Sequence, residues 1–214
     1  GLFGLIYFGI AALMQTDIKR MFAYSSASHL SFISAGIFSL NSYGINGALY
    51  LIIAHAIATG ALFLLVGLIH EQTGFKTIKD LGGIAKKAPI FTFIFAVMLF
   101  ANIGLPGTNG FVSELLIIFG IYEFNHTLGY ISALTVIIGA SYMLWMFQRA
   151  ILQNRPEGSI ELKMRDLKIK EILGLAPWVI LVFLMGFYPE VFMNKFEPTV
   201  THYLNDILQI GATK

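Results

Sequence analysis

The sequence predicts an all-α integral membrane protein with about six transmembrane helices, one of them discontinuous. The 214 residues are 57% hydrophobic and only 12% charged, whereas a soluble domain is about half apolar and about a quarter charged. The apolar residues form segments close to the ~20 residues that a helix needs to cross a bilayer core of about 30 Å. Polar and apolar side chains alternate over no long stretch, which argues against a transmembrane barrel.

The predicted spans follow one another along residues 1–197 and form one helical bundle. The first stretch, 1–16, is short and begins inside an apolar run without a Met or a charged leader, so we expect the natural chain to start upstream. The other apolar stretches are 21–40, 44–69, 89–122, 128–152 and 172–189.

The tail, residues 198–214, has a different pattern. Its apolar side chains recur at helical spacing among polar ones, beginning with Val200, Tyr203, Leu204 and Ile207. This spacing predicts a short amphipathic helix at the membrane interface or against a neighbour. A loosely ordered terminus is the alternative.

The basic residues predict the orientation of the bundle. They gather in or beside three connecting segments, 17–20, 70–88 and 153–171, while the residues after 171 include only Lys195 and Lys214. The two remaining connections contain neither Lys nor Arg. Because Lys and Arg are retained on the cytoplasmic side, we expect the three basic segments to face the cytoplasm and both chain ends to face the opposite side.

The stretch 89–122 is too long for one straight span. As a continuous helix it would measure roughly 51 Å at about 1.5 Å per residue, against an apolar core of about 30 Å. Its middle contains a proline, which cannot donate a backbone hydrogen bond, among several glycines. The predicted break comprises Asn102, Gly104, Pro106, Gly107 and Gly110. Discontinuous helices of this kind occur where transporters handle ions; a simple proline kink is the alternative.

Three ionisable residues lie inside the predicted spans, away from their ends: His29, His55 and Glu114. Such groups are costly in a bilayer unless they face a bundle interior or water, so each is a candidate functional residue. A histidine changes charge near neutral pH and can accept a proton on one ring nitrogen while releasing one from the other. The three residues therefore predict a proton relay, against the alternative of histidines that only join neighbouring helices.

Three further residues are candidates for relay support. Ser25 precedes His29 by four positions and Thr59 follows His55 by four, so each hydroxyl shares a helix face with its histidine. Lys19 lies at a helix junction on the basic side, where a topology anchor is the simpler interpretation.

Other functional classes find no support in the residues. The sequence has no GxGxxG, GxxxxGK[ST], HExxH or GxSxG motif, and a net charge of +2 suggests no nucleic-acid partner. Because there is no cysteine, thiolate metal sites and iron–sulfur clusters are excluded from this chain. We therefore expect no catalytic, cofactor or metal site in the chain itself.

Several motifs carry a resemblance to a known family. The run from Gln15 to His29, with Ser26, Ser28 and His29 at its end, resembles the antiporter-like proton-translocating subunits of respiratory complex I, of the M-subunit and mitochondrial subunit 4 type. Ile53-Ala54-His55 followed by Gly60-Ala61-Leu62-Phe63, the run Gly104 to Glu114, and Gly186-Phe187-Tyr188-Pro189 are also similar to that family. Ser113 stands where the family usually has Gly. The resemblance covers only the C-terminal part of the family pattern.

The resemblance implies roles and partners. His29 and His55 would be relay histidines and Glu114 the terminal proton-transferring carboxylate, while the family's Glu–Lys pair and central lysine would lie upstream. NADH, FMN, iron–sulfur clusters and quinone would reside in partner subunits of the NADH:quinone oxidoreductase. The partners of this chain would be other membrane subunits of that complex, especially neighbouring antiporter-like subunits, and the lipid bilayer. The chain would be multi-pass in an energy-conserving membrane, with the bacterial inner membrane favoured. A subunit of a cation/proton antiporter or membrane-bound hydrogenase, or a structural membrane scaffold, is the alternative.

Overall fold

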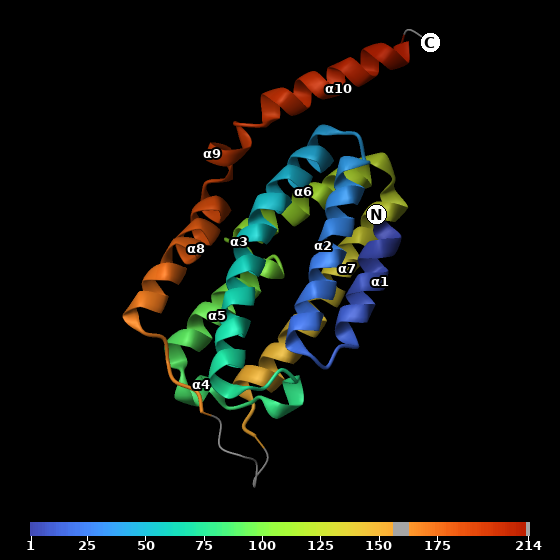
Figure 1. Cartoon of the computed structure of the whole chain (residues 1–214). Helices are drawn as coiled ribbons and strands as arrows, with labels where there is room; N and C mark the ends of the chain where they lie inside the picture. The colour runs from blue at the N-terminus through green and yellow to red at the C-terminus, as the bar shows by residue number, and fades with distance from the viewer. Residues whose placement is uncertain (156–162, 213–214) are drawn as a thin grey trace.

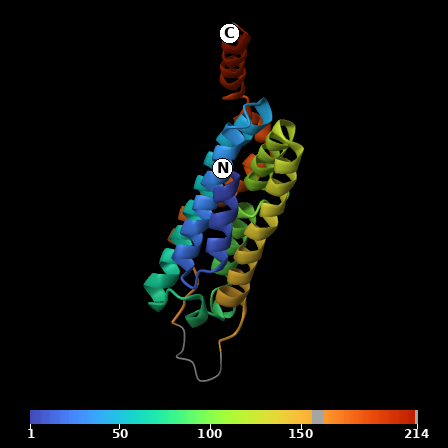
Figure 2. The ribbon, with the colours of Figure 1, turned by 90° about the vertical axis from the view of Figure 1, so that its right-hand side faces the viewer.

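The computed structural model describes residues 1–155 and 163–212, nearly all of them in helices that run along one elongated bundle (Figures 1 and 2). Within these ranges β-type pairing is limited to a single antiparallel bridge between Asp17 and Thr77. The predicted all-α fold is therefore confirmed. Residues 156–162 of the fifth connection, and Thr213, Lys214 and the side chains of 208–212 in the predicted tail, lie outside the described residues.

The first two helices, α1 (Leu2–Leu13) and α2 (Ile18–Ile37), form a closely packed pair. Asp17 begins α2 because its carboxylate accepts hydrogen bonds from the backbone N–H groups of Lys19 (2.8 Å) and Arg20 (3.0 Å). A side-chain oxygen at this position satisfies donors that the first helical turn leaves unpaired. The helix consequently starts before the predicted apolar stretch 21–40.

The longest helix is α3 (Ser42–Thr73), which packs against α2, α5 and α6. Asn41 caps its first turn by accepting a hydrogen bond from the Gly44 N–H at 2.9 Å. It ends at Gly74, whose φ of 75° needs a residue without Cβ. The short elements η1 (Ile78–Asp80) and α4 (Ile84–Lys87) follow at one end of the bundle.

The stretch predicted to be discontinuous forms two helices, α5 (Pro89–Asn102) and α6 (Asn109–Phe124), with a non-helical segment between them. Pro89 occupies the first turn of α5, where the missing proline N–H costs nothing. The predicted discontinuity is therefore confirmed, and it lies in the region that the sequence indicated.

A loop carboxylate fixes the start of α5. Asp166 accepts hydrogen bonds from the backbone N–H groups of Ile90 (3.0 Å) and Phe91 (2.9 Å) in α5, and from that of Leu167 (2.9 Å). Burial alone would raise the pKa of the Asp166 carboxyl, but these three donors hold it below its usual value. The fifth connection is thereby tied to the first half of the discontinuous helix.

The remaining helices complete the bundle and its extension. They are α7 (His126–Phe147), which continues as the π-helical η2 (Gln148–Leu152), then α8 (Ile169–Phe187), α9 (Pro189–Met193) and α10 (Glu197–Ala212). Figure 1 shows α10 at the end of the molecule opposite α4, extending beyond the bundle. The tail is helical as predicted, and its boundary at residue 197 as a separate unit stays a prediction.

Three of the described helical segments are long and apolar enough to cross a bilayer: Ser42–Thr73, His126–Leu152 and Ile169–Phe187. Leu2–Leu13 and Pro89–Asn102 are shorter apolar helices. The chain is thus a multi-pass membrane protein, while the count of about six spans stays a prediction.

Polar side chains are buried inside this bundle as well as apolar ones. The main core cluster joins side chains of α2, α3, α5, α7 and α8. Among them lie buried polar residues, including Ser25, Thr59, Asn102, Asn109, Ser113 and Glu114. Because buried polar groups are costly unless they find partners, their gathering around the helix break marks the candidate site.

Candidate functional site

The break is shaped by glycines at both helix ends. At the end of α5, the N–H of Leu105 donates to the Phe100 carbonyl (3.0 Å) and that of Gly104 to the Ala101 carbonyl (3.4 Å). This pair of bonds is a Schellman motif, which needs a left-handed residue, and Gly104 has a φ of 72°. A Cβ on Gly110, at the start of α6, would meet the Ala101 carbonyl oxygen. The two half-helices therefore approach each other backbone to backbone.

The other two predicted break residues lie between the half-helices. Pro106 follows the last turn of α5, which ends at Asn102. If the helix continued through Pro106, the proline ring would displace the Asn102 carbonyl. Gly107 has a φ of 90°, and its carbonyl oxygen lies where a Cβ on Gly186 of α8 would stand. Helix α8 thus packs directly against the break.

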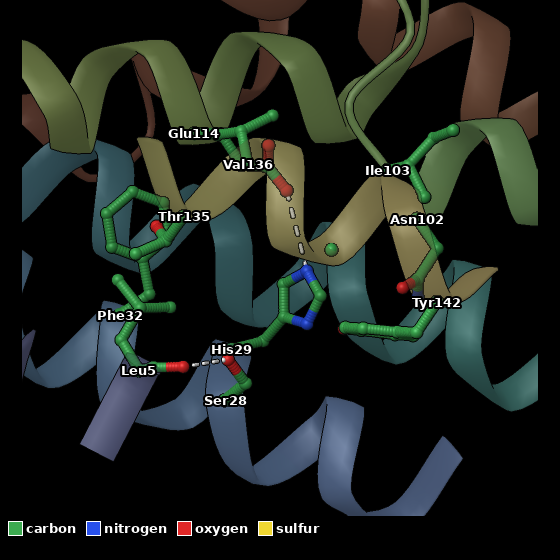
Figure 3. A pocket seen from close by; sticks show the side chains of 11 residues that line it. Leu5, Ser28, His29, Phe32, Asn102, Ile103, Glu114, Thr135, Val136 and Tyr142 are labelled. Carbon is green, nitrogen blue, oxygen red and sulfur yellow. Dashed lines mark hydrogen bonds and ion pairs between the residues drawn. The ribbon is translucent and has the colours of Figure 1, made fainter. Parts of the chain in front are cut away.

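Glu114 projects from α6 into the bundle and is 7% exposed. Its Oε1 lies 3.4 Å from Nε2 of His29 on α2, as Figure 3 shows. A Cβ on Gly104 would come within 2.6 Å of the other carboxylate oxygen. The left-handed glycine of the break therefore also makes the room that the Glu114 carboxylate occupies.

The His29 ring is held by its other nitrogen. Nδ1 lies 2.9 Å from the backbone carbonyl oxygen of Ser25. A carbonyl only accepts hydrogen bonds, so Nδ1 carries the hydrogen and Nε2 is the nitrogen free to exchange a proton with Glu114. The backbone carbonyl of Ser25, and not its hydroxyl, therefore orients the ring. The role of the Ser25 hydroxyl in supporting a relay stays a prediction.

His55 joins the site from α3. Its ring stacks on that of His29, with ring centroids 4.6 Å apart and an interplanar angle of 27°. The Thr59 hydroxyl oxygen lies 3.2 Å from Nδ1 and 3.4 Å from Nε2 of His55. The Asn102 side-chain amide donates to that same hydroxyl at 2.6 Å. The two histidines, Thr59 and Asn102 therefore form one cluster across α2, α3 and α5.

Neither the motifs nor the ionisable residues of the sequence pointed to Tyr142. Its hydroxyl, on α7, donates to the Ser25 hydroxyl at 2.8 Å, and both residues are 1% exposed. A tyrosine in the middle of an apolar stretch is a signal of its own, since a buried phenol usually finds a hydrogen-bond partner. The partner itself was unpredictable, because the two residues are 117 positions apart.

A cavity of about 30 Å³ lies beside His29 and Glu114. It lies between α1, α2, α5, α6 and α7, and its polar lining includes Ser28, His29, Asn102, Glu114 and Tyr142 (Figure 3). Since about 10–15 Å³ is enough for one water molecule, the cavity has room for one or two. Proton exchange between His29 and Glu114 would therefore take place in a polar, protein-lined space.

One predicted supporting residue lies elsewhere. Lys19 is exposed at the start of α2, about 15 Å along the helix from His29 at about 1.5 Å per residue. The structure brings Ser25 and Thr59 to the histidines but leaves Lys19 at the basic end of the bundle. Among residues 1–155 and 163–212, no three His, Asp or Glu side chains gather into a metal site, and the expected lack of a cofactor in this chain stays a prediction.

A multi-pass helical bundle in which a discontinuous helix brings a carboxylate against a buried histidine is typical of membrane proteins that move ions. The chain belongs to the family described as NADH:quinone oxidoreductase/Mrp antiporter, transmembrane, whose sequence model matches residues 1–139.

Individual relatives agree with this assignment. The chain is 38% identical over 200 residues to NADH-quinone oxidoreductase subunit M of Rickettsia bellii, covering 94% of this chain and 40% of the relative. It is 37% identical over 198 residues to NADH-ubiquinone oxidoreductase chain 4 of Marchantia polymorpha, covering 92% and 40%. The predicted resemblance to the M-subunit and subunit 4 type is confirmed, and the chain spans about 40% of the length of these curated relatives.

A solved structure agrees as well. In respiratory complex I from Thermus thermophilus with bound NADH, a chain of 32% identity matches with a TM-score of 0.87. The match covers 95% of this chain and 43% of that one. The helical arrangement described above therefore resembles that of a chain in this complex.

Proposed function

We propose that this chain is the C-terminal part of a proton-translocating membrane subunit of NADH:quinone oxidoreductase, in which His29, His55 and Glu114 relay protons. The observation that carries the proposal is the 3.4 Å approach of His29 Nε2 to Glu114 Oε1, beside a polar cavity at the helix break. Ionisable side chains that meet in this way inside a bundle are rare unless they have a function.

The proton step follows from the hydrogen bonds. Because Nδ1 of His29 is bonded to the Ser25 carbonyl, a proton reaches and leaves this ring through Nε2, which faces the carboxylate. Transfer from Nε2 to Oε1 leaves a neutral imidazole and a protonated Glu114. The carboxyl group then releases the proton toward the far side of the membrane. NADH, FMN, iron–sulfur clusters and quinone in partner subunits would drive the cycle.

The position of the basic segments supports the proposed orientation. Hydrogen bonds from the Ile18 N–H to the Lys76 carbonyl (3.1 Å) and from the Gly83 N–H to the Gln153 carbonyl (2.7 Å) tie the three segments together. The described residues of these segments share one end of the bundle, near α4 (Figure 1). We propose that this end faces the cytoplasm of a bacterial inner membrane and that neighbouring antiporter-like subunits are the partners.

Replacement of one carboxylate tests the proposal in the full-length subunit within its intact complex. The variant Glu114→Gln should reduce NADH-driven proton pumping by at least about tenfold, because a positioned acid–base group contributes about 10²–10⁴ to a proton transfer. NADH oxidation by an artificial acceptor and assembly of the complex should persist. Glu123→Gln, at an exposed position on the same helix, is the matched control. An unchanged ratio of protons to electrons in the Glu114 variant would reject the relay.

A second function, that of a cation/proton antiporter subunit, is supported by the family description, which names both protein types. It requires no redox partner. Acidification of vesicles that depends on sodium or potassium, in the absence of NADH, would favour it. A membrane-bound hydrogenase subunit would instead respond to hydrogen. If the chain is a structural scaffold, the complex would keep its pumping in the Glu114→Gln variant.

A further inference from the structure

The two histidines lie too nearly parallel to pass a proton directly. The N–H bonds of an imidazole lie in the plane of its ring, and hydrogen bonds weaken steeply away from that direction. With an interplanar angle of 27° and centroids 4.6 Å apart, His29 and His55 face each other through their ring surfaces. A proton that moves between the two sides of this stack must therefore go around it.

Thr59 contacts His55, and Asn102 contacts Thr59. An amide NH₂ group only donates, so the Thr59 oxygen is the acceptor of the 2.6 Å bond from Asn102. This leaves the Thr59 hydroxyl hydrogen available to donate to His55. The donor order from Asn102 through Thr59 to His55 fixes the orientation of all three groups.

The same amide has a second polar atom, Oδ1. Asn102 is 5% exposed and lines the cavity with His29 and Glu114. Its Oδ1 is buried and has no hydrogen-bond partner among the described residues. A buried amide oxygen of this kind is normally satisfied by an ordered water, provided that the space is polar and large enough. The cavity of about 30 Å³ is large enough, and Ser28, His29 and Glu114 add polar groups to its lining.

We propose that Asn102 is a positioning residue that holds an ordered water at Oδ1 and thereby connects the Thr59–His55 pair to the His29–Glu114 pair. This inference rests on the proposed proton relay and adds to it a residue that acts through water and through Thr59. The amide orients its neighbours, while the protons move along the water in the cavity.

Two substitutions of Asn102 separate this role from a merely structural one. Asn102→Leu keeps the size of the side chain but removes the acceptor and makes the wall apolar. Asn102→Ala removes the amide and leaves space in which a second water can take its place. In the full-length subunit of the intact complex, we expect NADH-driven pumping to fall about tenfold in the leucine variant and to recover in part in the alanine variant. A structural role predicts the reverse order, because alanine leaves the larger cavity.

Two measurements accompany the pumping assay. The solvent deuterium isotope effect on pumping should rise in Asn102→Leu, since proton transfer becomes slower relative to other steps. A structure of the intact complex that resolves water should show density within hydrogen-bond distance of Asn102 Oδ1, and none there in the leucine variant. If the leucine variant fails to assemble, the isotope effect is measured in Asn102→Ala and in Thr59→Val instead. A rise in these variants supports the inference, and an unchanged isotope effect contradicts it.

Asn46 provides the matched control. It is a buried asparagine on α3, 4% exposed, whose Oδ1 also has no partner, and it lies outside the cavity lining. Asn46→Leu should leave the ratio of protons to electrons and the isotope effect unchanged. Equal losses in the Asn46 and Asn102 variants, or full pumping by Asn102→Leu, would overturn the inference. Because Glu114→Gln is measured in parallel, a relay that works without Asn102 is distinguished from the absence of a relay.

Discussion

The contact between the two half-helices can be tested by adding one methyl group. Gly110 begins the first turn of α6, and a Cβ at this position would overlap the Ala101 carbonyl oxygen and lie 3.2 Å from its carbonyl carbon. Gly104 Cα is the next neighbour, at 3.5 Å. All three atoms belong to the backbone of the break, so no side chain can rotate away. Gly110→Ala therefore forces α6 to move relative to α5.

The size of the effect follows from this geometry. Real Cβ atoms essentially never come within 3.0 Å of another heavy atom, and relief of the overlap requires a shift of about 1 Å. Overpacking of this kind costs about 1–3 kcal/mol, which at about 2–4 °C per kcal/mol lowers Tm by roughly 2–12 °C. A displacement of about 1 Å in a reacting group can reduce a rate about 100-fold. Glu114, which lies one helical turn beyond Gly110, would move with α6.

The assay compares Gly110→Ala with Gly67→Ala in the full-length subunit of the intact complex. Gly67 lies in α3, and a Cβ added there would meet nothing within 4 Å. Alanine at this position should therefore be neutral or stabilising by up to about 1 kcal/mol. Thermal unfolding of the purified complex and NADH-driven pumping per enzyme are measured for both variants. If Gly110→Ala matches Gly67→Ala in Tm and in pumping, the half-helices do not make the close backbone contact on which the site geometry depends.

Two further predictions concern single buried or capping groups. Tyr142→Phe removes the donor to the Ser25 hydroxyl at a site that is 1% exposed, and the unpaired partner should cost about 1–3 kcal/mol, measured by thermal unfolding. Asp166→Ala removes the acceptor that caps α5, at a cost of about 1 kcal/mol. Because the folded-state pKa of Asp166 lies below its usual value, this difference should be complete at neutral pH. It should disappear as the pH falls below about 4, measured by thermal unfolding of both proteins at each pH.

Local signals in the sequence were enough to predict the broken helix. The stretch is longer than the bilayer core and has a proline and glycines at its centre, and these residues interrupt a helix. The observed gap lies between Asn102 and Asn109. The same holds for the candidates His29 and Glu114, since ionisable residues stand out in apolar spans. These features depend on residues close together in the chain, and sequence patterns report on them directly.

Features that depend on the packing of distant helices could not be predicted in this way. The sequence placed His29 and His55 on consecutive spans but gave no sign that their rings would stack, because stacking depends on the relative shift of α2 and α3. Helical spacing correctly paired Thr59 with His55 but missed that Asn102 would donate to the Thr59 hydroxyl from α5. The start of α2 also differs from the predicted start at residue 21, since Asp17 caps the helix ahead of the apolar residues.

The break itself explains how one site combines these parts. In a continuous helix Asn102 and Glu114 would be separated by about 18 Å along the axis at about 1.5 Å per residue, yet both line the same cavity of about 30 Å³. Gly104 and Gly110 let the two half-helices approach each other closely, so that the amide that bonds Thr59 and the carboxylate that faces His29 come together. An unbroken helix could present one of these groups to the histidines but not both. Discontinuity is therefore the condition for a relay that joins α2, α3 and α6.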